Sequence, residues 1–156
     1  MKLTKTLWAV LLALGLSFTS CSDDADDDNT TEPVVAALSN EIQVDIDGEN
    51  WRGNISSVAR SGGLTQLNAV KANSNISIQI FLPTDSINSF NIPTSIVTVA
   101  VTRGSNVLSN SPAGNLLLST NDSTSIKGTF NCSVTRFAAN ADTLVLTNGE
   151  FNFTFQ

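Results

Sequence analysis

Apolar and polar residues alternate along much of the chain, and this pattern most limits what the chain can fold into. The period of two runs through residues 42–46, 76–82, 97–101 and 126–134. Such alternation is typical of strands that bury one face in an antiparallel sheet. No stretch from Glu41 onward has an apolar stripe with helical spacing. The sequence therefore predicts an all-β domain without long helices.

Residues that favour turns separate these segments. Gly, Asn, Ser and Pro gather at residues 61–63, 72–75, 83–91, 104–106, 110–114, 121–125 and 138–141. About eight to ten short strands at this spacing predict a single antiparallel, meander-type β-sandwich or flattened barrel over residues 40–156. The sequence leaves the choice between sandwich and barrel open.

The Asn148-Gly149 dipeptide predicts a hairpin near the C-terminus. It separates two strand-like segments, residues 143–147 and 150–155, and Asn-Gly favours the type I′ turn of a two-residue hairpin loop. This register would place four apolar side chains on one face: Leu144, Leu146, Phe151 and Phe153.

A second hairpin is predicted to turn through residues 47–50. A loop of two or four residues puts Trp51 on the same face as Val44 and Ile46. We therefore interpret Trp51 as a core anchor; the alternative is a platform that stacks on a ligand.

The first 21 residues follow the pattern of an export signal. Lys2 and Lys5 precede an apolar stretch, Leu7–Leu16, that is too short to span a bilayer, and this predicts a signal peptide over residues 1–20. Residues 18–21 resemble the lipobox of bacterial lipoproteins, although Phe18 stands where Leu or Val is usual. The resemblance implies that Cys21 is lipidated and anchors the chain to the membrane. The alternative is an ordinary cleaved signal, with Cys21 as a plain residue.

An acidic run follows Cys21. Residues 23–28 contain five aspartates and resemble the signal that routes Bacteroidota lipoproteins to the cell surface. The resemblance implies an outer-membrane protein that faces outward; a simple solvated spacer, on a protein that faces the periplasm, is the alternative. Like-charge repulsion and Pro33 predict a disordered tether over residues 21–39.

The composition of the chain argues against nucleic-acid binding and enzyme activity. From Asn40 onward there are eight acidic and six basic residues, so the domain offers no basic footprint for a nucleic acid. The chain has no histidine, the usual base beside a nucleophilic Ser or Cys, and no Gly-x-Ser-x-Gly motif. We expect no catalytic residues and no cofactor. Cys132 shares a predicted strand face with Phe130 and Val134, which indicates a buried, inert thiol.

The acidic segment at residues 45–49 is superficially similar to a calcium-binding loop. It lacks the spacing of an EF-hand and the later bidentate Glu, so we interpret it as a turn with solvated acids. A zinc site is disfavoured because the chain has no histidine and only one cysteine besides Cys21. We expect no metal site.

Three Asp-Ser or Asp-Thr sequences resemble the general O-glycosylation signal of Bacteroidota. They make Ser86, Ser123 and Thr143 candidate glycosylation sites. The alternative is that these residues only form turns, in which Asp-Ser and Asp-Thr are common.

The whole pattern resembles one family. The lipobox and acidic leader occur with residues 47–51, an Ile-Ser-Ile-Gln-Ile strand, Gly-Thr-Phe at 128–130 and the closing sequence of 146–153. Together these features resemble a family of small Bacteroidota lipoproteins of unknown function. The resemblance implies a location and a β architecture, but no catalytic residues.

From these features we expect a non-catalytic binding module for a glycan or a protein partner. The alternatives are a structural or accessory envelope lipoprotein and a lipocalin-like carrier of a small ligand. A cleft lined by Trp51 would favour the binding module. A large exposed apolar patch would favour the accessory role. A wide unfilled interior would favour the carrier.

Overall fold

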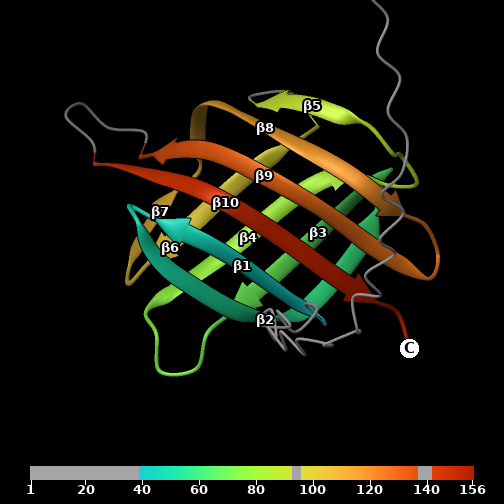
Figure 1. The fold of residues 1–156 in the computed structure, drawn as a ribbon, viewed down its shortest axis with the longest axis horizontal. Helices are drawn as coiled ribbons and strands as arrows, with labels where there is room; N and C mark the ends of the chain where they lie inside the picture. Colours follow the sequence, from blue (N-terminus) through green and yellow to red (C-terminus); the bar gives the residue numbers. More distant parts are fainter. Residues whose placement is uncertain (1–38, 93–95, 137–141) are drawn as a thin grey trace, which may run out of the picture. The chain divides into compact units, whose positions relative to one another are not determined.

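The computed structural model describes residues 39–92, 96–136 and 142–156 (Figure 1). They form β1 (Glu41–Ile46), β2 (Glu49–Ser61), β3 (Leu64–Val70), β4 (Ile76–Pro83), β5 (Ser89–Ile92), β6 (Thr98–Arg103), β7 (Asn106–Leu108), β8 (Asn110–Asn121), β9 (Ser125–Thr135) and β10 (Thr143–Thr154). About 75% of the described residues lie in strands and none lies in a helix, which confirms the all-β prediction. The predicted signal peptide, Cys21, nearly all of the predicted tether and the whole predicted break at 138–141 lie outside the described residues.

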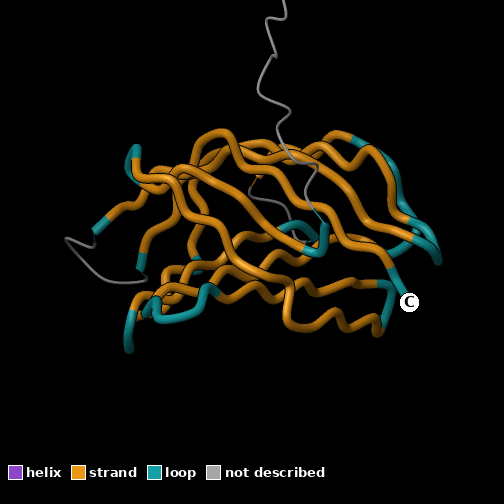
Figure 2. Tube along the Cα trace, turned by 60° about the horizontal axis from the view of Figure 1, so that its bottom comes forward, coloured by secondary structure: helices purple, strands orange, loops and turns teal. Residues whose placement is uncertain are grey.

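The ten strands form one antiparallel sheet in the order β5-β8-β9-β10-β1-β2-β3-β4-β6-β7. The sheet curls into a half-barrel, and its strands stack in two layers (Figure 2). In Figure 1, β8, β9, β10 and β1 run side by side while β3 and β4 cross behind them. The 13-residue β2 joins the two layers. An extra residue at Ser56 interrupts its register with β3, and such bulges bend a strand.

Strands that are neighbours in sequence mostly pair, as a meander requires, but two pairings are long-range. β1 lies between β2 and β10, so the first and last described strands are neighbours in the sheet. β5 leaves β4 and pairs with β8 at the opposite edge of the sheet. The half-barrel is therefore two meanders that join through β1 and β10.

The predicted hairpin at Asn148-Gly149 is wrong. Residues 143–154 form one continuous strand, β10, which pairs with β9 on one side and with β1 on the other. Asn148 is an extra residue in both ladders, because the register shifts at this point against both neighbours. It adopts a positive φ of 53°, so Asn-Gly forms a β-bulge instead of a hairpin turn.

The predicted facing of the apolar residues in this segment is nevertheless right. The extra residue at Asn148 shifts the alternation, so that even-numbered residues face inward before it and odd-numbered residues after it. A two-residue hairpin loop at the same place would have the same effect. Leu144, Leu146 and Phe151 are buried, and Phe153 is partly buried against the same core.

One predicted break is entirely strand, and another contains most of a short strand. Residues 110–114 begin β8, and most of β5 lies within the predicted break at 83–91. β8 accommodates Pro112 because its register with β9 shifts there and its pairing with β5 begins only at Gly114. The other predicted breaks in the described part of the chain contain the expected turns.

The inward faces of the strands form one hydrophobic core. Its largest fully buried side chains are Phe130, Phe151, Ile42, Leu67, Ile78, Ile80, Leu82, Leu116, Leu118, Ile126, Leu146 and Val44. Aromatic rings cover inward-facing glycines: a Cβ at Gly128 would collide with the Phe151 ring, and one at Gly149 with the Phe130 ring. The two rings pack with their centroids 6.2 Å apart. Side chains therefore fill the interior of the half-barrel.

A side chain joins the two limbs of the curled sheet where strand pairing does not. Ser111 at the start of β8 is 3% exposed, and its hydroxyl donates a hydrogen bond of 2.9 Å to the carbonyl oxygen of Val99 in β6. This bond connects β8 to β6, which are not neighbours in the sheet.

Candidate functional site

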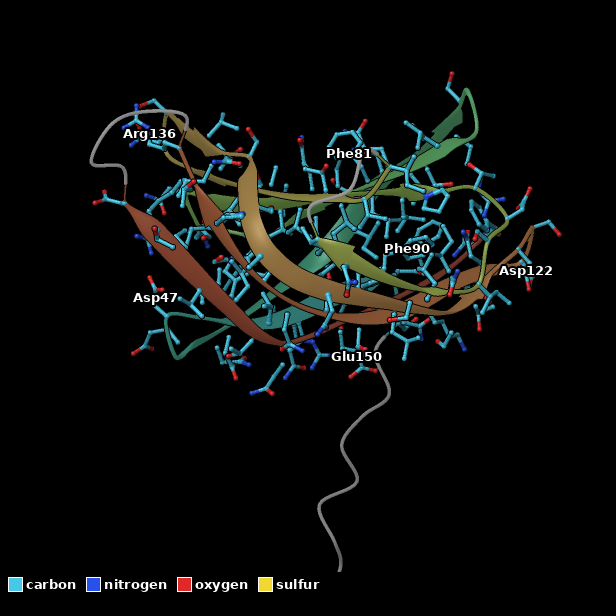
Figure 3. The ribbon with its side chains drawn as sticks, turned by 90° about the horizontal axis from the view of Figure 1, so that it is seen from above. Asp47, Phe81, Phe90, Asp122, Arg136 and Glu150 are labelled. Carbon is cyan, nitrogen blue, oxygen red and sulfur yellow. The ribbon has the colours of Figure 1, made fainter. Side chains whose placement is uncertain are left out.

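The connections between strands gather at two ends of the half-barrel. The β1–β2 turn, the β3–β4 loop, the β6–β7 turn and the first residue of β10 lie at one end, which we name the Asp47 end. The β2–β3 turn, the β4–β5 loop, the β8–β9 turn and the last residues of the chain lie at the other, the Asp122 end. Figure 3 shows Asp47 and Arg136 toward one end and Asp122 at the opposite end.

Polar side chains tie together several elements at the Asp122 end. Asn121 is 2% exposed, and its amide donates hydrogen bonds to the carbonyl oxygens of Pro83 at 2.6 Å and Ser86 at 3.2 Å. Arg60 of β2 donates to the carbonyl oxygen of Asp122 at 2.6 Å, and its guanidinium lies 4.6 Å from the ring centroid of Phe155. These bonds join β2, β4 and β8, which are not neighbours in the sheet.

The Asp47 end contains a hollow that combines charged, polar and apolar side chains. Its volume is about 270 Å³, and its lining residues are Ile46, Asp47, Glu49, Asn50, Trp51, Lys71, Ser74, Ile76 and Arg103. They come from the β1–β2 hairpin, the β3–β4 connection and the end of β6. We name this hollow the Asp47 pocket. Its size lies near the lower limit of ordinary ligand sites.

Turn chemistry and hydrogen bonds fix the first wall of the Asp47 pocket. Asp47 and Gly48 have positive φ values of 51° and 86°, and Ile46 pairs with Glu49 across them, so the predicted hairpin has a two-residue loop. Asp47 also bonds to β10: its N–H donates to the Val145 carbonyl oxygen at 2.9 Å, and its carboxylate accepts from the Val145 N–H at 2.8 Å. The turn is thus held against a strand nearly one hundred residues away.

A backbone hydrogen bond connects the other two walls of the pocket. The N–H of Gly104, in the β6–β7 turn, donates to the carbonyl oxygen of Asn75 at 2.8 Å. Ile76 also pairs with Arg103 in the β4–β6 ladder. Arg103 is therefore held beside the loop that carries Lys71 and Ser74.

Trp51 is a core residue at the base of the pocket, as the sequence analysis predicts. It is 4% exposed and pairs with Val44 across the hairpin. Its ring covers Gly53, where a Cβ would collide with it. The indole Nε1 is buried and has no hydrogen-bond partner among the described residues. A buried N–H without a partner is uncommon in folded proteins.

The charged residues around the pocket fall into two groups. The Asp47 carboxylate accepts a backbone hydrogen bond, as described above. Lys71 and Arg103 are exposed, and neither forms an ion pair with any residue in the described part of the chain. These two cations are available to a ligand. The sequence analysis did not single them out, and their only signal is that Lys71 directly follows one strand and Arg103 ends another.

Asp45 lies beside the pocket and supports its scaffold. Its carboxylate accepts hydrogen bonds from Asn148 at 2.9 Å and from Asn50 at 3.1 Å. These two bonds, with the Asn148 bond first in importance, lower the pKa of Asp45 because they favour the charged form. Asp45 thus connects the pocket-lining residue Asn50 to the bulge in β10.

The structure does not bring the candidate glycosylation residues together. Ser123 is exposed in the β8–β9 turn, Thr143 is exposed at the start of β10, and Ser86 is partly buried in the β4–β5 loop. Next to Ser123, the Asp122 carboxylate accepts from the N–H groups of Thr124 and Ser125 at 2.7 and 2.9 Å, so the turn interpretation accounts for this aspartate. Glycosylation at the three residues stays a prediction.

The remaining candidate sites are as follows. Cys132 is 5% exposed, and burial raises the pKa of its thiol to about 12, so its predicted burial is confirmed. No group of three or more His, Cys, Asp or Glu side chains that could hold a metal ion occurs in the described residues. Those residues also form no helix long and apolar enough to cross a membrane.

Comparisons with protein-family models, with curated proteins and with solved structures find no match for this chain. What the Asp47 pocket can do must therefore be judged from its own residues.

Proposed function

We propose that this protein is a lipid-anchored outer-membrane protein whose β domain is a non-catalytic binding module, with the Asp47 pocket as its ligand site. The observation that carries the proposal is the contrast between the two ends of the half-barrel. Arg60 and Asn121 tie elements together at the Asp122 end, and the hollow there is lined by uncharged residues: Ala59, Ser61, Leu64, Gln66 and Phe81. The Asp47 pocket is instead lined by two cations that form no ion pair with any described residue. Preformed hollows with a few polar groups are the usual form of a small-ligand site.

The proposed location rests on the N-terminal sequence. The lipobox-like residues 18–21 and the acidic run at 23–28 resemble those of surface lipoproteins of Bacteroidota, and we propose the same family for this chain. Several acyl chains on Cys21 would give stable attachment, because a single chain binds a membrane only weakly.

A carrier of the lipocalin kind fits the half-barrel less well. Such a carrier needs an empty interior, but Phe130, Phe151 and their neighbours fill this one. A purely structural role has less support because the large exposed apolar residues alternate with polar partners. Leu117, for example, pairs with Ser89 and Thr129, and Val145 pairs with Ser133.

The proposal predicts that the full-length chain, solubilised in a mild detergent, retains ligands from a glycan array or from outer-membrane extract. Replacing Lys71 by Glu reverses a charge at the pocket and should weaken the captured interaction by about tenfold, the effect of losing one charged hydrogen bond. The matched control is Lys127→Glu, on an exposed position of β9 away from the pocket. Silence in both assays, or equal loss in both variants, would remove the Asp47 pocket as the site.

A further inference from the structure

Resting on the proposed function, we infer that the ligand of the Asp47 pocket is an anionic saccharide, with its single carboxylate or sulfate group held between Arg103 and Arg136. The inference starts from the position of Arg103. Its side chain lines the Asp47 pocket and also a narrow crevice of about 40 Å³ beside it. The crevice is lined by Arg103, Asn106, Leu108, Arg136, Asp142 and Leu144.

The crevice has the donors that recognise an oxyanion. Arg103 reaches it from the end of β6, and Arg136 from the residue that follows β9. Neither guanidinium forms an ion pair with any residue in the described ranges, although Asp142 lines the same crevice. A planar guanidinium offers paired N–H donors that match a carboxylate or a sulfate. The volume suits one such group and not a larger ring.

The backbone holds Arg103 at this junction. Arg103 pairs with Ile76 of β4 on one side and with Asn106 of β7 on the other. The next residue, Gly104, has a positive φ of 61° and bonds to Asn75. The turn thus fixes the start of the Arg103 side chain, which lowers the entropy cost of placing the guanidinium on a ligand.

The other lining residues limit how much negative charge the ligand carries. Glu49 lines the pocket and Asp142 lines the crevice, so a polyanion would meet repulsion on both sides. A ligand with one anionic group and an otherwise neutral body avoids this cost.

The pocket beside the crevice suits the body of a sugar. Asn50 and Ser74 supply polar atoms that can bond to hydroxyl groups. Ile76, which is only half-buried, supplies apolar surface for the C–H face of a sugar ring. A peptide with a C-terminal carboxylate is the competing ligand class, and its longer apolar side chains have less surface to cover here.

The test uses an array that carries matched acidic and neutral oligosaccharides, probed with the full-length chain in detergent. We expect binding to oligosaccharides that end in one uronate or one sulfated sugar, and binding to their uncharged matches weaker by about tenfold. Arg103→Gln and Arg136→Gln should each lower the retained binding by about tenfold, whereas the exposed control Arg52→Gln should leave it nearly unchanged. Raising the salt from about 50 to 300 mM should also weaken it, since these cations are exposed.

The outcomes separate this inference from the function it rests on. Binding of neutral glycans that Arg103→Gln does not affect would overturn the inference and leave a glycan-binding pocket. Capture of peptides but not glycans would overturn the inference and leave a protein-binding module. Absence of any binding would overturn both. Preference for uronate or for sulfate identifies which oxyanion the two arginines recognise, and either one supports the inference.

Discussion

Cys132 shows how the surroundings of a cysteine can make its thiol unreactive. It lies on the inward face of β9, and desolvation by burial raises the pKa of its thiol from 9.0 to about 12. The thiolate is the reactive form. Burial therefore lowers the reactivity of Cys132 in two ways, because reagents cannot reach the sulfur and because the thiol stays protonated. The sequence predicted this correctly because Cys132 shares the period of two with Phe130 and Val134.

We predict that Cys132 in the folded Cys21→Ser chain, where it is the only thiol, reacts with a thiol reagent at pH 8 at least about a hundredfold more slowly than in urea. The same pKa shift fixes a stability trend. Since the unfolded thiol ionises near 9.0 and the folded one near 12, the contribution of Cys132 is complete below pH 9 and falls as the pH rises toward 12. The slope is at most about 1.4 kcal/mol per pH unit.

Urea titrations at several alkaline pH values measure this slope. Cys132→Ala is the control, because it keeps every other group that titrates at alkaline pH but lacks the thiol. Rapid labelling of the folded chain, or the same slope in both proteins, would contradict the prediction.

At the scale of elements, β10 shows how far the sequence determines the fold. A type I′ hairpin and a bulge at Asn148-Gly149 both use a positive φ at Asn148, and both reverse the inward side of the chain. The local pattern therefore fixes which residues face the core but not whether the chain turns back. The choice is made by β1, more than one hundred residues earlier, and by β9, which pair with the two sides of a continuous β10.

The same limit applies to the candidate site. The sequence correctly placed Trp51 beside Val44, because a short hairpin sets that contact. It could not bring Arg103 and Lys71 together with Trp51, because the β4–β6 pairing and the Gly104–Asn75 hydrogen bond join segments whose spacing carries no such signal.

The bulge predicts a sharp difference between deleting and replacing Asn148. Asn148→Gly keeps the residue count and tolerates the positive φ, and the side-chain bond to Asp45 that it loses is exposed, so it should change the stability little. Deleting Asn148 would turn Phe151 toward solvent and should cost at least about 3 to 5 kcal/mol, the usual cost of losing a buried Phe. Urea unfolding of both variants measures these costs, and equal stability would show that β10 does not depend on the bulge.

For the half-barrel as a whole, an incompletely paired sheet needs side chains to hold its limbs together. Ser111 bonds β8 to β6, and Asn121 and Arg60 join β8 to β4 and β2 at the Asp122 end. The turns that line the Asp47 pocket are held by separate bonds, from Asp47 to Val145 and from Gly104 to Asn75. The contacts of Arg60 and the proposed ligand pocket therefore lie at opposite ends of the same sheet.

This division predicts that Arg60→Gln destabilises the fold without changing the Asp47 pocket. The Arg60 side chain is 25% exposed and contacts the Asp122 carbonyl and the Phe155 ring, so its replacement should cost about 1 to 3 kcal/mol. Arg52→Gln removes an exposed ion pair with Glu41 and should cost no more than about 1 kcal/mol. Hydrogen exchange should then show faster opening of the β8–β9 turn in Arg60→Gln alone, because that turn loses its bond to β2. If the β6–β7 turn also opened faster in Arg60→Gln, the two ends would be coupled. The contacts at the Asp122 end would then not stabilise that end independently of the Asp47 end.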